Sequence, residues 1–285
     1  MIGGLVMVTL AAMSWGTWSL FLRPTGLPAM VASPIIFAVM SVVTLPLALA
    51  QRRPVAVWDR RTLLLLLGNA FFDGANVATF FAAISYTTVA VAVLSHYVAP
   101  IMIALAAPRI EGVAARGAGP AAAVALLGLV IVLEPWHAPA AGATVGAALG
   151  VVSAVCYAGN VFTVRRLAER IGAPRAMAYH SLIAAVVLAP LAAGRLGEVS
   201  PHAALLLVAG SLTIGAAAGI IYAIGLVRIG SARAAILAYA EPLVAVGVGA
   251  FVWGESLHPL AAVGGALVLG AGIYVVRGSR DKPAS

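Results

Sequence analysis

Ten long apolar runs dominate this chain of 285 residues and limit what it can fold into. A helix needs about 20 apolar residues to cross the hydrocarbon core of a membrane. The runs cover residues 2–21, 29–50, 62–83, 87–108, 118–134, 142–164, 174–193, 202–224, 231–252 and 259–277. They are apolar on all sides, whereas the strands of a membrane barrel are shorter and alternate in polarity. The sequence therefore predicts an all-α integral membrane protein with ten transmembrane helices.

Composition supports this class and argues against several others. Hydrophobic residues make up 63% of the chain and charged residues only 9%, against about 25% charged residues in soluble domains. The net charge of +8 does not indicate a nucleic-acid partner, because the basic residues form no basic face. The single cysteine, Cys156, cannot form a disulfide within the chain or a cysteine-based metal site. We expect no metal and no cofactor.

The basic residues alternate between the two sides of the predicted bundle. Fifteen of them fall on one side and only two, Arg23 and Arg195, on the other. The fifteen are Arg52, Arg53, Arg60, Arg61, Arg109, Arg116, Arg165, Arg166, Arg170, Arg175, Arg228, Arg233, Arg277, Arg280 and Lys282. Because lysine and arginine accumulate in cytoplasmic loops, both termini are predicted to face the cytoplasm, in a multi-pass protein of the inner (plasma) membrane.

The two halves of the chain share landmarks at an offset of 142 residues. The motif "SWGTW" at 14–18 matches "CYAGN" at 156–160, and Tyr97 and Pro100 match Tyr239 and Pro242. Each half holds five predicted spans, so an odd number of crossings turns the second half upside down. The sequence predicts two inverted five-helix repeats, 1–137 and 138–285. Secondary transporters are often built this way, with the substrate bound between the repeats.

Three stretches carry a resemblance to a known family. They are "MSWGTW" at 13–18, "FFAAISYTTVAVAVLSHYVAP" at 80–100 and "YAIGLVRIGSARAAILAYAEPLVAV" at 222–246. With the ten-span pattern, the chain resembles EamA-type transporters of the drug/metabolite transporter superfamily, and most of all their exporters of aromatic amino acids and related metabolites. The resemblance implies that the two repeats surround a central cavity lined by spans 1, 3, 4, 6, 8 and 9, while spans 5 and 10 pack at the periphery.

The third run carries the first candidate site residues. Asp73 has Asn76 three residues after it and Phe80 seven after it, so these side chains share one stripe of a helix. An ionisable side chain at membrane depth costs roughly 2.5–3.5 kcal/mol on insertion scales, so this stripe should face protein or water. We predict that Asp73, Asn76 and Phe80 bind substrate. Hydrogen bonding that holds the helices together is the alternative.

A His-Tyr pair in the apolar stretch "VLSHYVAP" at 93–100 supplies a second group. Pro100 lacks an N–H group and clashes with the carbonyl group four residues before it, and Pro242 repeats this pattern beside Tyr239. The sequence predicts two kinked helices, with Pro100 and Pro242 as hinges and His96, Tyr97 and Tyr239 lining a cavity. A histidine satisfied by a neighbouring helix at a static kink is the alternative.

Aromatic residues of the first and sixth runs complete the predicted site. Trp15 and Trp18 lie three residues apart, and Tyr157 and Asn160 take their places in the second half. Aromatic rings offer stacking and cation–π contacts, so we predict that these four side chains also bind substrate. Ordinary packing in the core is the alternative.

Glu241 stands beside Pro242 and has no lysine or arginine at its depth in the predicted bundle. The resemblance implies a structural role for it, because a Glu-Pro pair is widespread at this place among members with diverse substrates. We therefore predict that Glu241 holds its helix in place and that transport follows the gradient of the substrate.

The predicted function is a secondary transporter that exports small metabolites, aromatic or hydrophobic amino acids above all, by alternating access. Export of cationic drugs or dyes is the alternative. A membrane-embedded enzyme is disfavoured because the chain lacks H-E-x-x-H and G-x-S-x-G motifs, and a channel is disfavoured because no ring of charge is evident. The expected partners are a small-molecule substrate and the lipid bilayer, with no nucleotide, and a monomer should suffice.

Overall fold

A computed structural model describes residues 1–52, 57–112, 117–137, 142–255 and 258–278. Over these residues the protein is built from helices, without a strand. Four of the basic residues used to predict the topology lie outside the described ranges: Arg53, Arg116, Arg280 and Lys282. Residue 138, where the second repeat was predicted to begin, also lies outside them.

Among the described residues, the first half of the chain contains seven α-helices and two short 3-10 segments. The α-helices are α1 (Ile2–Trp15), α2 (Ser19–Leu22), α3 (Ala29–Ala50), α4 (Arg60–Tyr86), α5 (Val89–His96), α6 (Ala99–Glu111) and α7 (Ala118–Leu133). The 3-10 segments are Arg23–Thr25 and Pro135–His137.

The second half of the chain continues with further helices. Its α-helices are α8 (Ala143–Ile171), α9 (Ala173–Ala192), α10 (Pro201–Gly210), α11 (Ala218–Ile229), α12 (Ser231–Leu237), α13 (Ala240–Trp253) and α14 (Leu260–Gly278). A π-helical segment, Ser211–Ala217, joins α10 to α11, and Leu196–Glu198 forms a 3-10 turn.

In the part of the chain that the structure describes, eight helical stretches are long and apolar enough to cross a membrane. Two further apolar helices, Ala118–Leu133 and Leu260–Val275, are shorter. The protein is therefore a helical, multi-pass membrane protein. Several helices extend beyond the predicted runs, most clearly Ala143–Ile171 against 142–164, because the charged last turns of α8 make ion pairs with neighbouring elements.

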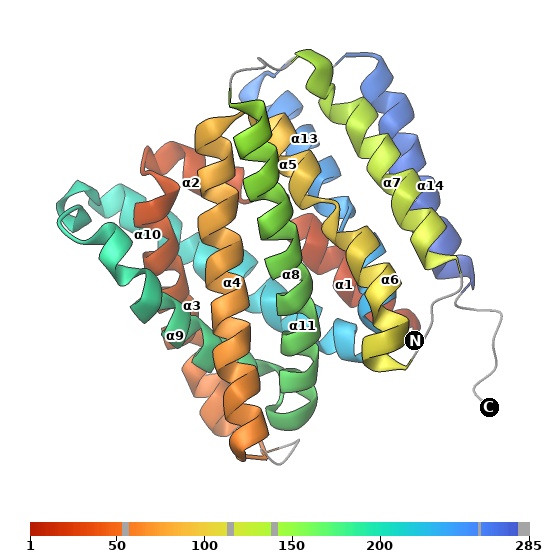
Figure 1. Cartoon of the computed structure of the whole chain (residues 1–285). Coiled ribbons are helices and arrows are strands. Elements are labelled where there is room, and N and C mark those ends of the chain that lie inside the picture. Colours follow the sequence, from red (N-terminus) through yellow and green to blue (C-terminus); the bar gives the residue numbers. More distant parts are fainter. Residues whose placement is uncertain (53–56, 113–116, 138–141, 256–257, 279–285) are drawn as a thin grey trace.

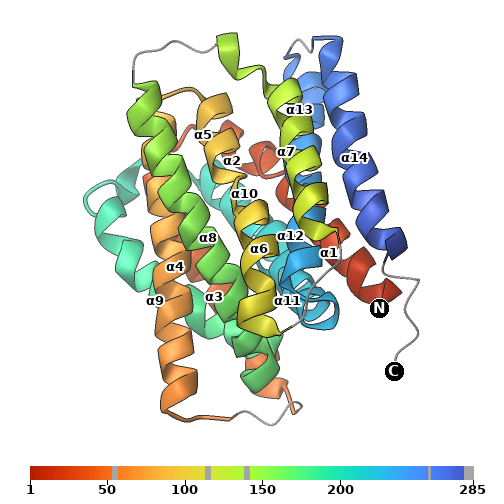
Figure 2. The same cartoon turned by 45° about the vertical axis from the view of Figure 1, so that its right-hand side comes forward.

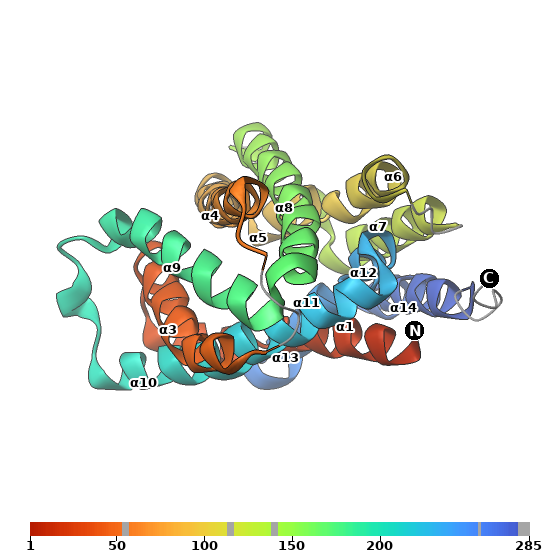
Figure 3. The ribbon, with the colours of Figure 1, turned by 90° about the horizontal axis from the view of Figure 1, so that it is seen from below.

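The helices pack in a small number of extensive pairs. They are α4 with α8, α3 with α9, α7 with α14, α1 with α11, α5 with α8, and α6 with α12. Figure 1 shows α7 and α14 side by side at one edge of the bundle and α3 and α9 at the opposite edge. Figure 2 again shows α7 and α14 on the opposite side from α3 and α9, and the view from below in Figure 3 shows α8 and α11 between α9 and α14.

Glycines allow the closest of these approaches. A Cβ atom on Gly128 of α7 would lie 2.5 Å from the carbonyl oxygen of Gly264 on α14, and one on Gly264 would lie 2.4 Å from the oxygen of Gly128. On α8, Gly146 and Gly150 face Thr87 and Ser95 in the same way. Small residues that let helices pack at close range are a common means of association in membranes.

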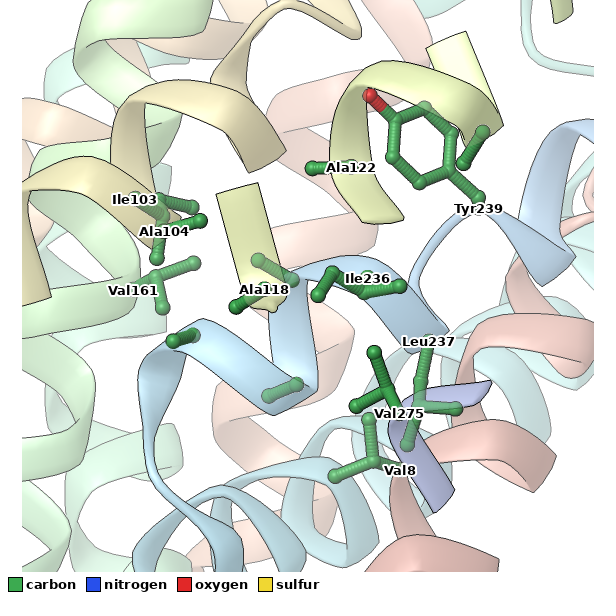
Figure 4. Close-up of a cluster of buried hydrophobic side chains, with 14 of the residues drawn as sticks. Val8, Ile103, Ala104, Ala118, Ala122, Val161, Ile236, Leu237, Tyr239 and Val275 are labelled. Carbon is green, nitrogen blue, oxygen red and sulfur yellow. The ribbon is translucent and has the colours of Figure 1, made fainter. Parts of the chain in front are cut away.

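The largest apolar core lies around α12 and joins it to α1, α6, α7, α11 and α14. Figure 4 shows this cluster, in which Ile236, Leu237 and Tyr239 of the α12 region meet Ile103, Ala122 and Val275. Six of the seven residues of α12 are buried. The helix is thus enclosed on all sides, which matters for the position of Tyr239.

Asp59 caps the start of α4 and joins it to the end of α8. Its carboxylate accepts a hydrogen bond from the backbone N–H of Thr62 at 2.7 Å and pairs with the guanidinium of Arg170. The backbone hydrogen bond from Thr62 is the main cause that lowers the pKa of Asp59 to about 2. The carboxylate is therefore ionised at neutral pH, where it caps α4 and pairs with Arg170 at the end of α8.

Candidate substrate-binding site

A cavity of about 440 Å³ lies in the middle of the bundle, within the range of roughly 300–1,000 Å³ typical of small-molecule sites. Its walls come from α1, α3, α4, α8, α9, α11 and the two broken helices. Nine of the ten residues predicted to bind substrate line it: Trp15, Trp18, Asp73, Asn76, Phe80, His96, Tyr97, Tyr157 and Asn160. The tenth, Tyr239, does not.

The aromatic side chains form one continuous wall. His96 lies at its centre, with ring centroids 5.0 Å from Phe80, 5.2 Å from Tyr157 and 5.3 Å from Tyr97. Trp15 packs against Tyr222 at 4.7 Å. Tilted and edge-on contacts of this kind are the favoured geometries of aromatic pairs, so the rings hold one another in place around the cavity.

The indole of Trp15 is fixed by the backbone of the opposite half. Its Nε1 donates a hydrogen bond of 3.1 Å to the carbonyl oxygen of Ile214, which lies in the π-helical segment. A π-helical turn is wider than an α-helical one and is frequent at functional sites. Trp15 thus links α1 to the second half of the chain at the cavity wall.

Both predicted kinks are complete breaks in the helices. α5 ends at His96 and α6 begins at Ala99, and α12 ends at Leu237 and α13 begins at Ala240. Pro100 and Pro242 lie in the first turn of the resumed helices, where a missing N–H leaves no helical bond unmade.

The two breaks touch each other. The rings of Tyr97 and Tyr239 lie 5.7 Å apart, and the Tyr239 hydroxyl donates a hydrogen bond of 2.8 Å to the carbonyl oxygen of Tyr97. Tyr239 is fully buried, and its hydroxyl is hydrogen-bonded to the backbone of the other break. The prediction that Tyr239 lines the cavity was therefore wrong. The reason is its setting, since α12 is enclosed by other helices.

His96 belongs to a neutral polar cluster. Its Nδ1 lies 2.8 Å from the hydroxyl oxygen of Ser153, and that hydroxyl donates to Oδ1 of Asn76 at 2.7 Å. Because the one hydroxyl proton is used on Asn76, the oxygen of Ser153 accepts from Nδ1 of His96. Ser153 of α8 was missed by the sequence analysis, and its position one turn before Tyr157 was the available signal.

Asp73 belongs to a second cluster, which contains an acid. One carboxylate oxygen, Oδ1, accepts from Nδ2 of Asn160 at 3.0 Å, and the other, Oδ2, lies 3.0 Å from Nε2 of His180. His180 of α9 was not among the predicted site residues. Its depth in an apolar run was the only sequence signal for it.

Glu241 also lines the cavity. Its carboxyl group lies close enough to the Tyr97 hydroxyl to interact with it. Its backbone packs against α1 so closely that a Cβ atom on Gly16 would lie 2.4 Å from the Glu241 carbonyl oxygen. The residue predicted to be structural therefore has both a packed backbone and a side chain in the cavity wall.

The second and seventh predicted spans contribute more than the resemblance implied. Phe37 and Met40 of α3 and Met177 and His180 of α9 line the cavity. Tyr222 of α11 was also missed, although it matches the predicted Phe80 at the offset of 142 residues. No residue of α7 or α14 within the described ranges lines the cavity, in keeping with a peripheral place for these helices.

Comparison with known proteins identifies the class. Residues 144–277 match the model of the EamA-like transporter family. An uncharacterized transporter from Archaeoglobus fulgidus is 32% identical over 275 residues, which cover 94% of each chain. A crystal structure at 20% identity superposes with a TM-score of 0.82 over 97% of this chain and 98% of that one, and it shares the fold. With a relative that similar over almost its whole length, the chain belongs to the EamA-like transporter family.

Proposed function

We propose that this transporter exports small amphipathic metabolites, above all aromatic or hydrophobic amino acids, by alternating access. The observation that carries the proposal is the cavity itself. Aromatic rings of Trp15, Tyr97 and Tyr222 border the same space as the polar groups of Asn76 and Asn160. A ligand with an aromatic or aliphatic side chain and a charged end has a partner for each part in such a space.

Ten membrane crossings in two inverted repeats, residues 1–137 and 138–285, belong to this proposal. The helix pairing supports it, because an exchange of the two halves maps α4 with α8 onto α11 with α1. The same exchange maps α3 with α9 and α7 with α14 each onto itself. Figures 1 and 2 also place the start of α1 and the end of α14 at the same end of the bundle, as an even number of crossings requires.

The orientation follows from the basic residues, and we propose cytoplasmic termini in the inner membrane. A cysteine at Arg60, with Cys156 replaced by serine, should resist an impermeant thiol reagent in intact cells. A cysteine at His137 should be labelled. The opposite pattern would reverse the orientation.

A second candidate function is the export of organic cations. The observation that favours it is the charge of the lining, which contains the carboxyl groups of Asp73 and Glu241 but no lysine or arginine among the described residues. Aromatic rings near a carboxylate are suited to quaternary and protonated amines. Amino acids and cations share the ammonium group, so the two functions differ in whether a carboxylate on the ligand is tolerated.

The decisive experiment is counterflow in proteoliposomes without a pH gradient. Vesicles loaded with an unlabelled compound should exchange it for the same labelled compound, tested with L-phenylalanine, L-leucine, L-lysine and tetraethylammonium. Exchange of phenylalanine and leucine supports the first function, and exchange of tetraethylammonium alone supports the second. Exchange of neither class would refute both.

Two phenylalanines of the same helix give a matched control. Phe80 lines the cavity, whereas Phe71, also on α4, is 67% exposed on the outside of the bundle. Phe80→Ala should slow counterflow at least tenfold, and Phe71→Ala should leave it near the wild-type rate. Equal effects of the two substitutions would show that the cavity is not the route of transport.

A further inference from the structure

The middle of the bundle holds a contact between two ionisable side chains that the binding of a substrate does not by itself explain. Asp73 stands thirteen residues from either end of α4, which is about 20 Å at the rise of an α-helix. Its Oδ2 lies 3.0 Å from Nε2 of His180, and both side chains are largely buried, with 14% and 6% of their area exposed. Both line the cavity.

The hydrogen bonds on the Asp73 side have a fixed direction. The hydroxyl of Thr163 donates to the carbonyl oxygen of Gly159 at 2.7 Å, so its oxygen accepts from Nδ2 of Asn69 at 3.1 Å. The same Nδ2 donates to Oδ1 of Asn160 at 2.5 Å. Because Oδ1 of Asn160 faces Asn69, the other end of the Asn160 amide, Nδ2, faces Asp73. Oδ1 of Asp73 therefore accepts a hydrogen bond from this Nδ2 and carries no proton.

The His180 side is fixed in the same way. Its Nδ1 lies 3.0 Å from the carbonyl oxygen of Ala176, which can only accept, so Nδ1 carries a proton. Between Nε2 of His180 and Oδ2 of Asp73 there is then room for one proton, held by an imidazolium or by a carboxylic acid. With this proton the pair is neutral. Without it a lone pair faces a carboxylate, and a negative charge stays unbalanced at membrane depth.

No fixed positive group in the surroundings balances that charge. The titratable groups that face the pair across the cavity are Tyr157 of α8, His96 and Tyr97 at the first break, Tyr222 of α11 and Glu241 of α13. From α3 the pair meets the ring of Phe37, at 6.3 Å from the His180 ring. No lysine or arginine is among the described residues that line the space. Neutrality therefore needs either the proton or a positive group that enters the cavity.

We propose that Asp73 and His180 form a proton-binding site, and that the ammonium group of the transported molecule displaces the shared proton. The inference rests on the proposed function for the identity of the substrate. When the ammonium group binds at Oδ2 of Asp73, its positive charge takes the place of the proton, which leaves to the water on that side of the membrane. The carboxylate of an amino acid then has to be held by neutral donors of the cavity wall, since no lysine or arginine is among the described residues that line it. When the substrate departs on the other side, the pair takes up a proton there. One proton moves inward for each molecule exported, in place of the transport along the substrate gradient that the sequence predicted.

The proton site can be tested without transport. The full-length protein is labelled with 15N-histidine in detergent, and the His180 signals among its five histidines are assigned by their loss in His180→Gln. As the pH is raised, His180 and Asp73 should release one proton, and phenethylamine should shift this release to lower pH. Asp73→Asn should abolish the shift. A shift that survives in Asp73→Asn, or no shift in the wild type, would overturn the proposal.

The coupling is tested in proteoliposomes with a lumen one pH unit more acidic than the outside and the membrane potential held at zero. A one-for-one exchange then sustains up to about tenfold accumulation of labelled L-phenylalanine. Asp73→Asn should lose this accumulation, and His180→Gln should shift its dependence on pH. The matched control is His96→Gln, at the cavity histidine without an acidic partner, which should slow transport but keep the accumulation ratio.

The outcomes separate this inference from the proposed function. A protein that exchanges phenylalanine without a gradient but does not accumulate it under one has the proposed function and lacks the proton site. Accumulation that persists in Asp73→Asn and is lost in Glu241→Gln would place the proton at Glu241 and overturn the assignment. If phenylalanine is not exchanged at all, the proposed amino-acid substrate is refuted, while the effect of phenethylamine on His180 still decides the proton site.

Discussion

Tyr97 and Tyr239 stand at the same point of the two broken helices, each three residues before a proline, but their surroundings differ. Tyr97 follows α5, of which Ala92 is the only buried residue, and its side chain borders the cavity. Tyr239 follows α12, which is almost entirely buried, and its side chain is fully enclosed. The Tyr239 hydroxyl donates a hydrogen bond to the backbone carbonyl of Tyr97, and no matching bond from the Tyr97 hydroxyl to the second break is found among the described residues.

This difference shows what a landmark shared by the two halves of the sequence can and cannot specify. The matching proline ends each helix at the same place, because its effect on the backbone is local. The role of the tyrosine depends on the helices around it, and these differ between the halves in the size and polarity of their side chains. A repeat landmark is therefore a good guide to backbone geometry and a poor guide to which side chain meets the substrate.

The largest effect should come from removing the two rings. Tyr239→Ala should lower the free energy of unfolding by about 3–5 kcal/mol, because it leaves a hole in a closed core and an unpaired carbonyl group. Tyr97→Ala should cost less than half as much, since its ring already borders an open space. Unfolding by SDS, followed by circular dichroism, measures both. Equal losses would show that the two sites are equally enclosed and would remove the contrast.

The hydroxyl groups alone should sharpen the comparison at a smaller scale. Tyr239→Phe should lower stability by roughly 0.5–2 kcal/mol, because the carbonyl group of Tyr97 loses its donor inside the protein. It should leave the preference among transported amino acids unchanged. Tyr97→Phe should have the reverse profile, with little loss of stability and a changed KM for phenylalanine counterflow. A changed preference in Tyr239→Phe would contradict the division of roles.

Much of the fold was predictable because its causes lie within single segments. The apolar runs predict the helices, and Pro100 and Pro242 predict the breaks. The stripe of Asp73, Asn76 and Phe80 correctly predicted a side of α4 that faces the interior. The contact between Asp73 and His180 was not predictable, because it depends on how far α9 is shifted and rotated against α4, and nothing in either run specifies that register.

The burial of Tyr239 was missed for a related reason. The offset of 142 residues treats the halves as equivalent, whereas enclosure depends on which other helices cover each one. α12 is flanked by α1, α6, α7, α11 and α14, while α5 contacts chiefly α8. Apolar composition does not distinguish a helix that faces lipid from one that faces protein, so the two tyrosines looked alike in the sequence.

The smallest effect is expected at the two prolines. Pro100 is the second residue of α6 and Pro242 the third of α13, and both positions have no helical partner for an N–H group. Pro100→Ala and Pro242→Ala should therefore each lower the free energy of unfolding by only about 0.4–1 kcal/mol, because alanine gives the unfolded chain more conformational freedom.

Transport rates should distinguish the two proline variants. Pro100→Ala should slow phenylalanine counterflow more than Pro242→Ala, because a change at the first break moves His96 and Tyr97 at the cavity wall, while the second break moves the buried Tyr239. If the two variants slow counterflow equally, the breaks act as a symmetric pair of hinges, and the difference between the tyrosines has no part in the transport cycle.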